Sequence, residues 1–111
     1  MDLGIDIGTS SVKAVLMDDS GVVTDQANRP LPMSRPRPGW SEQDPADWWD
    51  AAHLVVASLP ARSRRAVRAI GLTGQMHGAT LLDASDRVLR PAILWNDVRS
   101  DAECRAIEAG R

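Results

Sequence analysis

The chain has 111 residues, of which 13 are basic and 15 acidic, so its net charge is near −2. Hydrophobic residues make up 43% of the sequence, which argues against intrinsic disorder, and the 8 glycines and 7 prolines argue against a coiled coil. A compact chain of this size has a radius of gyration of roughly 13 Å, enough for one modest core but not for two lobes that close on a ligand.

Charge and cysteine content restrict the class of partner. A near-neutral chain lacks the basic surface that binds a phosphate backbone, so we expect no nucleic-acid partner. The single cysteine, Cys104, excludes an intrachain disulfide and any multi-cysteine metal site; we expect it to be a small packed residue in a cytoplasmic protein. The chain has no stretch of roughly 18 apolar residues, so we expect no membrane partner.

Three short apolar runs open the chain. Residues 3–8 alternate large apolar side chains with glycine and one carboxylate, the period of a strand with one packed face. Runs at residues 12–17 and 22–27 follow, with the turn-forming segment 18–21 between them. This order predicts three antiparallel strands, and the proline-rich stretch 30–44 then predicts an ordered loop.

A helix over residues 45–59 is the best-defined element. Asp44 can accept hydrogen bonds from free backbone amides, and a proline is tolerated in the first turn. Apolar residues recur at helical spacing and place Trp48 and Trp49 in or beside the packed stripe. The arginine-rich segment 62–68 that follows is expected to be a solvated connection.

The second half of the chain alternates strands, turns and one helix. Residues 67–73 predict a strand buried on both faces, because their alternate positions are apolar or small. The runs at 80–82 and 87–89 predict a hairpin, and residues 92–95 predict a further extended segment. The order of elements is a mixed α/β pattern rather than a regular βαβ alternation.

A final helix is predicted over residues 98–109. The pair Asn96-Asp97 is expected to cap its start. Gly110 is expected to end it in the left-handed conformation that favours glycine.

The first group of candidate functional residues spans the turn between the first two strands. Glycine lets the backbone approach a ligand, consecutive amides in a tight turn can bind an anion, and hydroxyls add donors for phosphate oxygens. One carboxylate on a glycine-lined strand face suits hydrated magnesium beside those phosphates. An ordinary hairpin turn with Asp6 as a capping acid is the alternative interpretation. The residues are Asp6, Gly8, Thr9, Ser10, Ser11 and Lys13.

The second group follows the strand predicted at 67–73. Ligand sites in α/β folds favour the carboxyl ends of strands. Gln75 and His77 could hydrogen-bond sugar hydroxyls, with Met76 as an apolar wall, and Trp95 stands at a loop end where its ring could line a pocket. The alternatives are a structural histidine with satisfied hydrogen bonds and a tryptophan that only packs. The two histidines show no ligand spacing that would support a zinc site.

Four segments together resemble the amino-terminal part of the FGGY family of carbohydrate kinases, and within it the xylulokinases. The resemblance covers essentially all 111 residues and implies a ribonuclease H-like (actin-like ATPase) α/β fold. The chain would be the amino-terminal part of the first lobe, with a mixed sheet that starts with three antiparallel strands. The segments are GIDIGTSSVKAV (4–15), PGWSEQDP with the following WW (38–49), GLTGQMHG (71–78) and ILWNDVR (93–99).

The resemblance implies ATP and Mg²⁺ as cofactors and a small sugar as substrate. Asp6 would be the catalytic acidic residue that acts on magnesium and the phosphates. The phosphate path would be lined by Gly8, Thr9, Ser10, Ser11 and Lys13. The sugar would be contacted by Gln75, Met76, His77 and Trp95.

The implied reaction is phosphoryl transfer from ATP to the primary hydroxyl of D-xylulose, giving D-xylulose 5-phosphate. Glycerol kinases carry an Arg-Glu pair where this chain has Met76-His77, so the pair favours a ketose, with ribulokinase and gluconokinase as alternatives. The family's catalytic base and second lobe lie downstream, so we expect residues 1–111 to be an inactive portion of the amino-terminal domain. The full-length protein is expected to be a monomer or a homodimer. A non-catalytic sugar-binding half-domain and an actin-like or chaperone-like ATPase lobe stay open as alternatives.

Overall fold

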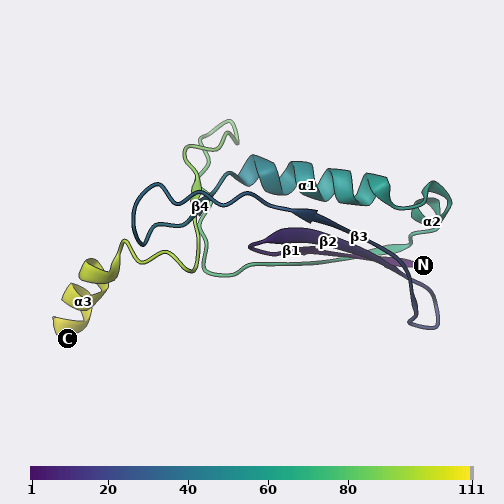
Figure 1. Cartoon of the computed structure of the whole chain (residues 1–111), viewed down its shortest axis with the longest axis horizontal. Helices are drawn as coiled ribbons and strands as arrows, with labels where there is room; N and C mark the ends of the chain where they lie inside the picture. Colours follow the sequence, from purple (N-terminus) through teal and green to yellow (C-terminus); the bar gives the residue numbers. More distant parts are fainter. Residues whose placement is uncertain (111) are drawn as a thin grey trace.

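The structure, a computed structural model, describes residues 1–110 and has one long helix lying along a sheet (Figure 1). A loop and a short helix extend away from this pair of layers (Figure 1). In chain order the elements are β1 (Asp2–Ile7), β2 (Ser11–Met17), β3 (Val23–Pro30), β4 (Glu42–Gln43), α1 (Pro45–Ser58), α2 (Ala61–Arg65), β5 (Ala69–Gly74), β6 (Ala92–Ile93) and α3 (Asp101–Ala109).

The main sheet has four strands in the order β3-β2-β1-β5. β1 pairs antiparallel with β2, and β2 with β3, so the predicted three-stranded meander is confirmed. β5 returns parallel to β1. Because successive side chains of a strand point to opposite faces, Ile5 and Ile7 face α1, while Asp6 lies on the opposite face beside its cross-strand partner Lys13.

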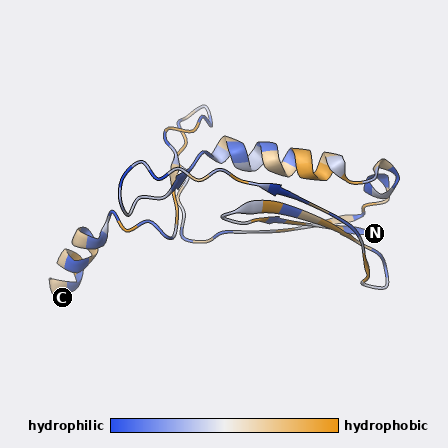
Figure 2. Cartoon of the chain, viewed as in Figure 1, coloured by the Kyte–Doolittle hydropathy of each residue, from blue (hydrophilic) through white to orange (hydrophobic). Residues whose placement is uncertain are grey.

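The core lies between this sheet and α1. β2 contributes Val12, Ala14 and Leu16, each with 0% of its surface exposed, and α1 contributes Ala51 and Val55. The most hydrophobic part of α1 lies toward its carboxyl end, above the sheet (Figure 2). Burying a valine or leucine side chain stabilises the fold by about 1.5–3 kcal/mol, and an alanine contributes less.

The long helix α1 begins as the sequence predicts. The Asp44 carboxylate accepts a hydrogen bond from the Ala46 amide at 2.9 Å, with proline in the first turn. Trp48 packs against the core, but Trp49 is 74% exposed, so the prediction that both lie in or beside the packed stripe is wrong for Trp49. One residue is a rotation of about 100° around a helix, which carries Trp49 off the packed face.

The strand β5 is correctly placed, but its predicted burial is wrong. All six of its residues are exposed, and Leu72 is 75% exposed. β5 is the edge strand on the side of the sheet away from β3, and α1 packs over β1, β2 and β3 instead. The apolar pattern identified a strand but not what covers it.

Two short elements were not predicted. β4 lies inside the stretch 30–44 that was expected to be loop, and it pairs antiparallel with β6, which confirms the extended segment at 92–95. α2 lies in the arginine-rich connection, and it buries none of its residues, in agreement with a solvated segment.

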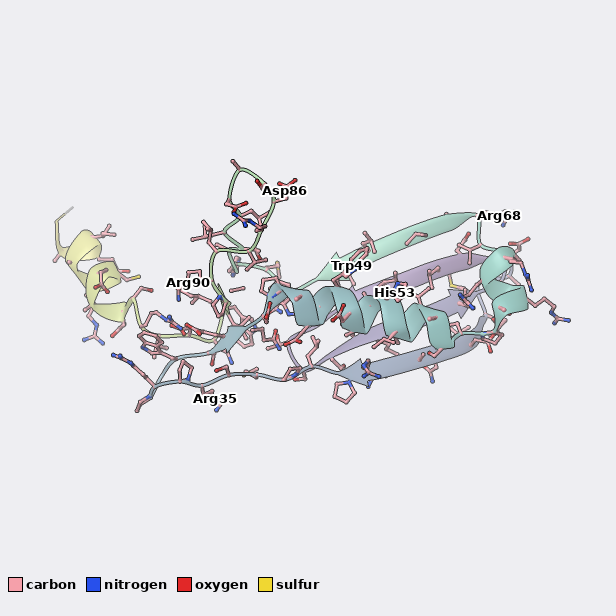
Figure 3. The ribbon with its side chains drawn as sticks, turned by 90° about the horizontal axis from the view of Figure 1, so that it is seen from above. Arg35, Trp49, His53, Arg68, Asp86 and Arg90 are labelled. Carbon is pink, nitrogen blue, oxygen red and sulfur yellow. The ribbon has the colours of Figure 1, made fainter. Side chains whose placement is uncertain are left out.

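The predicted hairpin over residues 80–89 is present in reduced form. Leu82 and Val88 make one isolated antiparallel bridge, and the Leu89 amide donates to the Leu81 carbonyl at 2.9 Å. Asp86 lies at the tip of this projecting loop, and Arg90 lies on the segment that leads back to β6 (Figure 3).

The last helix ends at Ala109 as predicted, but its start and the conformation of Gly110 differ from the prediction. α3 begins at Asp101, after Ser100, and Asn96-Asp97 does not cap it. Instead Asp97 accepts hydrogen bonds from the Ser41 amide and from Arg99, and Asn96 Oδ1 is buried without a hydrogen-bond partner among residues 1–110. Gly110 has φ of −89°, so it is not left-handed.

The chain is more extended than its length suggests. Its radius of gyration is 17.7 Å, and its dimensions are 56 × 29 × 28 Å. α3 buries none of its residues, and Cys104 on this helix is exposed, so the prediction that it is packed is wrong. No helix of the part that the structure describes has the length and apolar character needed to span a bilayer.

Substitution of Gly39 measures how tightly the loop before β4 packs, and Gly21, in the turn between β2 and β3, provides the comparison. Gly39 has φ of +78°, and a Cβ there would lie 2.7 Å from Val98 Cγ2; Gly21 has φ of +84° with open space around it. We expect Gly21→Ala to lower the free energy of unfolding by about 1 kcal/mol, the cost of left-handed backbone, and Gly39→Ala by about 1 kcal/mol more because Val98 must shift. Urea denaturation measures both. Equal losses would show that Val98 yields freely.

Candidate functional site

A cavity of about 450 Å³ opens where β1 and β5 end. The two strands run parallel, so their carboxyl ends meet at one edge of the sheet. This brings together the turn after β1 and the loop after β5, 66 residues apart in sequence at the Thr9 and Gln75 contact. The cavity is lined by Asp6, Gly8, Thr9, Gly74, Gln75, Met76, His77 and Trp95.

A second cavity of about 380 Å³ lies on the sheet face opposite α1 and shares Asp6 with the first. Gly4 and Gly71 have no side chains to fill this face of the sheet. Asp6 and Lys13 therefore project from it as a cross-strand pair. The remaining lining residues are Ile5, Val15, Leu72 and Thr73. Lys13 is thus near Asp6 but outside the first cavity.

The two serines of the first turn lie outside the lining of both cavities. The Ser11 carbonyl accepts from the Gly8 amide at 3.0 Å, and the Ser10 carbonyl accepts from the Leu31 amide at 2.9 Å. A Cβ on Gly8 would come within 3.1 Å of the Ser11 carbonyl oxygen, which is why glycine is needed for so tight a turn. In the structure Ser10 and Ser11 shape the turn through their backbones.

Thr9 joins the two groups of candidate residues. Its hydroxyl accepts a hydrogen bond from the Trp95 indole nitrogen at 3.0 Å and donates to Gln75 Oε1 at 3.4 Å. The backbone N–H of Gln75 also donates to the Ile7 carbonyl at 3.1 Å. The turn after β1, the loop after β5 and Trp95 are therefore connected directly by hydrogen bonds.

His77 stands out by its backbone. It has φ of 63°, a left-handed conformation that costs energy for any residue with a Cβ, and its side chain is exposed on the first cavity. The alternative of a buried structural histidine is therefore wrong. Met76 is 73% exposed and Trp95 61% exposed, so these side chains do not serve the core.

A cluster of charged residues holds the Trp95 segment to β4. The Arg99 guanidinium donates to Asp97 Oδ2 at 2.6 Å and to Glu42 Oε1 at 2.8 Å, and it stacks 3.6 Å from the centroid of the Trp40 ring. Asp97 Oδ2 also accepts from the Ser41 amide at 2.6 Å. Planar guanidinium suits this combination of ion pairs and stacking.

The sequence predicts no role in the site for Asp97 or Arg99. The structure shows that they tie the segment after β6 to the start of β4, with Leu94 donating to the Ser41 carbonyl at 3.0 Å. Glu42 and Arg99 are 57 residues apart, and no local pattern links them. Their effect on the site is indirect, because they hold the segment that carries Trp95.

The same contacts shift two pKa values. Hydrogen bonds from the Arg99 side chain lower the pKa of Asp97 far below its ordinary value, although burial acts in the opposite direction. The Asp97 side chain is only 1% exposed. In turn, hydrogen bonds to Asp97 raise the pKa of Arg99.

The residues present fit magnesium bound in its hydrated form. Among residues 1–110 there is no group of three or more His, Cys, Asp or Glu side chains that could enclose a metal ion. Asp6 is one exposed carboxylate beside a low, glycine-lined face. Mg²⁺ usually binds one or two carboxylates and keeps several waters and phosphate oxygens, so Asp6 is sufficient for that role.

The sheet order and the cavity at the strand ends define the ribonuclease H-like (actin-like ATPase) class of α/β fold. Two crystal structures share it. One, described as a xyloylose kinase from Brucella ovis, is 53% identical with a TM-score of 0.93 and covers 98% of this chain and 24% of its own. The other, a xylulose kinase from Rhodospirillum rubrum, is 39% identical with a TM-score of 0.90 and covers 99% of this chain and 23% of its own.

The chain belongs to the FGGY family of carbohydrate kinases, whose N-terminal domain matches residues 1–111. Xylulose kinase from Escherichia coli (strain K12) is 53% identical over 110 residues, which make up 98% of this chain and 23% of that protein. The chain thus spans about a quarter of the length of the relatives it matches. The family and the fold class predicted from the sequence are confirmed.

The lowered pKa of Asp97 predicts how the stability of the chain depends on pH. Its pKa is lower in the folded chain than the ordinary 3.8, so the unfolded chain binds the proton first as the pH falls. The stabilisation from Asp97 is therefore present above about pH 4 and is lost below it. We expect the stability of the unmodified chain to fall more steeply between about pH 5 and pH 2.5 than that of Asp97→Asn, which is already less stable at pH 7.

Urea denaturation at a series of pH values checks this. Asp18, Asp19 and Asp83 also have lowered pKa values, but they are present in both proteins and cancel in the comparison. Parallel pH profiles for the two proteins would contradict the role of Asp97.

Proposed function

We propose that this chain supplies the phosphate-binding turn and the sugar-binding turn of an ATP-dependent ketose kinase that acts on D-xylulose. The observation that carries the proposal is the pair of adjacent cavities that share Asp6. One holds the exposed Met76, His77 and Trp95, and the other holds Lys13. The xylulose kinases among the similar proteins support D-xylulose as the sugar.

The first cavity is suited to the sugar. His77 presents a ring that can donate or accept a hydrogen bond, and Met76 and Trp95 offer apolar surface for the carbon face of a sugar. Both ends of the Gln75 side-chain amide are already bonded within the chain. Gln75 therefore holds the site in shape more than it contacts the sugar.

The second cavity is suited to the phosphates. Lys13 supplies a positive charge, and Asp6 can orient magnesium-bound waters. The Gly8 turn, which lines the adjacent first cavity, lets the backbone come close to the phosphates where the two cavities meet at Asp6. Magnesium bound with ATP would neutralise charge that develops on the phosphates. Phosphoryl transfer depends mostly on such positioning and charge stabilisation.

In the proposed reaction the γ-phosphoryl group leaves the β-phosphate oxygen of ATP and bonds to the primary hydroxyl oxygen of the sugar. A base must accept the hydroxyl proton. We assign that base, and the lobe that closes over ATP, to sequence outside residues 1–111. Ribulose and gluconate are the alternative sugars.

A chimeric enzyme tests the proposal. Residues 1–110 of this chain would replace the matching 110 residues of the Escherichia coli xylulose kinase, and ADP release would be measured with D-xylulose, D-ribulose, gluconate and glycerol. We expect turnover with a preference for D-xylulose. A folded chimera without turnover would refute the kinase function, and a preference for another sugar would refute the assignment of D-xylulose.

Binding by the 111-residue chain alone separates a sugar-binding module from a kinase part. Titration with D-xylulose can be followed by tryptophan fluorescence, since Trp95 lies on the first cavity. Sugar binding by the chain, combined with an inactive chimera, would favour the non-catalytic module.

Two substitutions in the chimera should have different kinetic effects. We expect Asp6→Ala to lower kcat by at least about 100-fold, because a charge aimed at the phosphates is lost. His77→Ala should raise KM for the sugar by about tenfold, because it removes one hydrogen bond to the substrate, and should leave kcat within about threefold.

Matched controls are available on α1. Asp50→Ala removes an exposed carboxylate, and His53→Ala removes an exposed imidazole on α1 (Figure 3). Neither residue lines the two cavities that share Asp6. Both controls should retain unmodified kinetics. Unchanged kcat in Asp6→Ala would contradict the role given to Asp6.

A further inference from the structure

We infer that Gln43 is a positioning residue whose buried side-chain amide holds the phosphate-binding turn and the sugar-binding turn at a set separation. Gln43 is 2% exposed and lies in β4, outside both cavities. The consequence for catalysis rests on the proposed function, whereas the hydrogen bonds themselves do not.

The Gln43 amide uses its full hydrogen-bonding capacity. Nε2 donates to the Thr9 carbonyl at 2.6 Å and to the Pro32 carbonyl at 3.0 Å. Oε1 accepts from Trp48 Nε1 at 2.9 Å and from Gln75 Nε2 at 3.2 Å. A glutamine has two donor hydrogens and two acceptor sites, so no group of this amide is left unpaired.

The orientation of the amide follows from its partners. The indole nitrogen of Trp48 can only donate, so it must face Oε1, and the carbonyls of Thr9 and Pro32 can only accept, so they must face Nε2. Exchanging the oxygen and nitrogen would break all four bonds. The amide therefore has one allowed orientation.

Thr9, Gln75 and Gln43 form a closed ring of hydrogen bonds. The Thr9 hydroxyl donates to Gln75 Oε1, Gln75 Nε2 donates to Gln43 Oε1, and Gln43 Nε2 donates back to the Thr9 carbonyl. Trp95 donates into this ring at the Thr9 hydroxyl. From Trp95 through the Thr9 hydroxyl and the two side-chain amides, successive bonds polarise and strengthen one another.

The ring spans the boundary between the two proposed half-sites. Thr9 belongs to the turn after β1 and Gln75 to the loop after β5, while Gln43 lies behind both on a third element. A displacement of about 1 Å between reacting groups can lower a rate by about 100-fold. An interaction that fixes the two turns relative to each other should therefore affect turnover more than the binding of either substrate.

Amide hydrogen exchange on the full 111-residue chain, followed by NMR, tests the positioning itself. The Gly8 amide is bonded to the Ser11 carbonyl and the Gln75 amide to the Ile7 carbonyl, so each reports on one turn. In Gln43→Met, which keeps the side-chain length but loses the amide, we expect both amides to exchange at least about tenfold faster relative to β2 amides.

Val55→Ala serves as the matched control. Val55 is a core residue of α1 that is 2% exposed and makes no part of the ring, so its truncation destabilises the chain without touching the turns. It should speed exchange throughout the chain without singling out Gly8 and Gln75. Unchanged relative exchange in Gln43→Met, or the same selective change in Val55→Ala, would overturn the inference.

A second variant covers the case in which Gln43→Met does not fold. Gln75→Met replaces a half-buried side chain by one without an amide. It removes the hydrogen bonds of Gln75 to Thr9 and Gln43, and so breaks the ring at the loop after β5. It should speed exchange at Gly8, which belongs to the opposite turn. Unaltered Gly8 exchange in that variant would overturn the inference.

The chimeric kinase gives the catalytic consequence. Gln43→Met should lower kcat by at least about tenfold and leave KM for D-xylulose and for ATP within about threefold, while Val55→Ala keeps kcat at a temperature where it is folded. A rise in KM with unchanged kcat would overturn the positioning role. An inactive unmodified chimera would refute the proposed function instead, and hydrogen exchange would still decide whether Gln43 holds the turns.

Discussion

The burial of one side-chain amide constrains the end of the molecule that carries the candidate site. An amide removed from water without partners costs about 1–3 kcal/mol, so a glutamine that is 2% exposed needs every partner it has. The partners of Gln43 come from the turn after β1, the proline-rich loop, α1 and the loop after β5. One polar requirement thus orders four segments that make few regular hydrogen bonds among themselves.

The neighbouring residue does the same for the opposite side of β4. Successive residues of a strand point to opposite faces, so Glu42 faces away from the turns and meets Arg99. Removing one member of such a partly buried cluster would leave an unbalanced charge, and the cluster therefore favours one arrangement of the loops. The two-residue strand β4 carries one network toward the cavity and another toward the segment that holds Trp95.

Local sequence patterns predicted what depends on local physics. The alternation in β1 and β2, the capping of α1 by Asp44 and the position of both turns are confirmed, because each depends on residues within a few positions of one another. The partners of Gln43 and Glu42 are 32 to 57 residues away along the chain, apart from Trp48 and Pro32. Periodicity carries no information about such pairs, so the sequence predicts no role in the site for Gln43, Asp97 or Arg99, although all three lie in segments with family-like motifs.

The errors concern burial more than element type, and they share one cause. A run of apolar residues shows what a strand or helix is able to bury, but burial also requires a covering layer. β5 has the apolar pattern of an interior strand, yet Ile70 and Leu72 are 61% and 75% exposed because α1 lies over the other strands. Trp49 and Cys104 follow the same rule on α1 and α3. By contrast, the cavity residues lie at the surface and need no covering layer, and all of them except Trp95 lie at or beside the ends of two parallel strands. This explains why most of the predicted site residues come together at one cavity, whereas the predicted burial of β5, Trp49 and Cys104 is wrong.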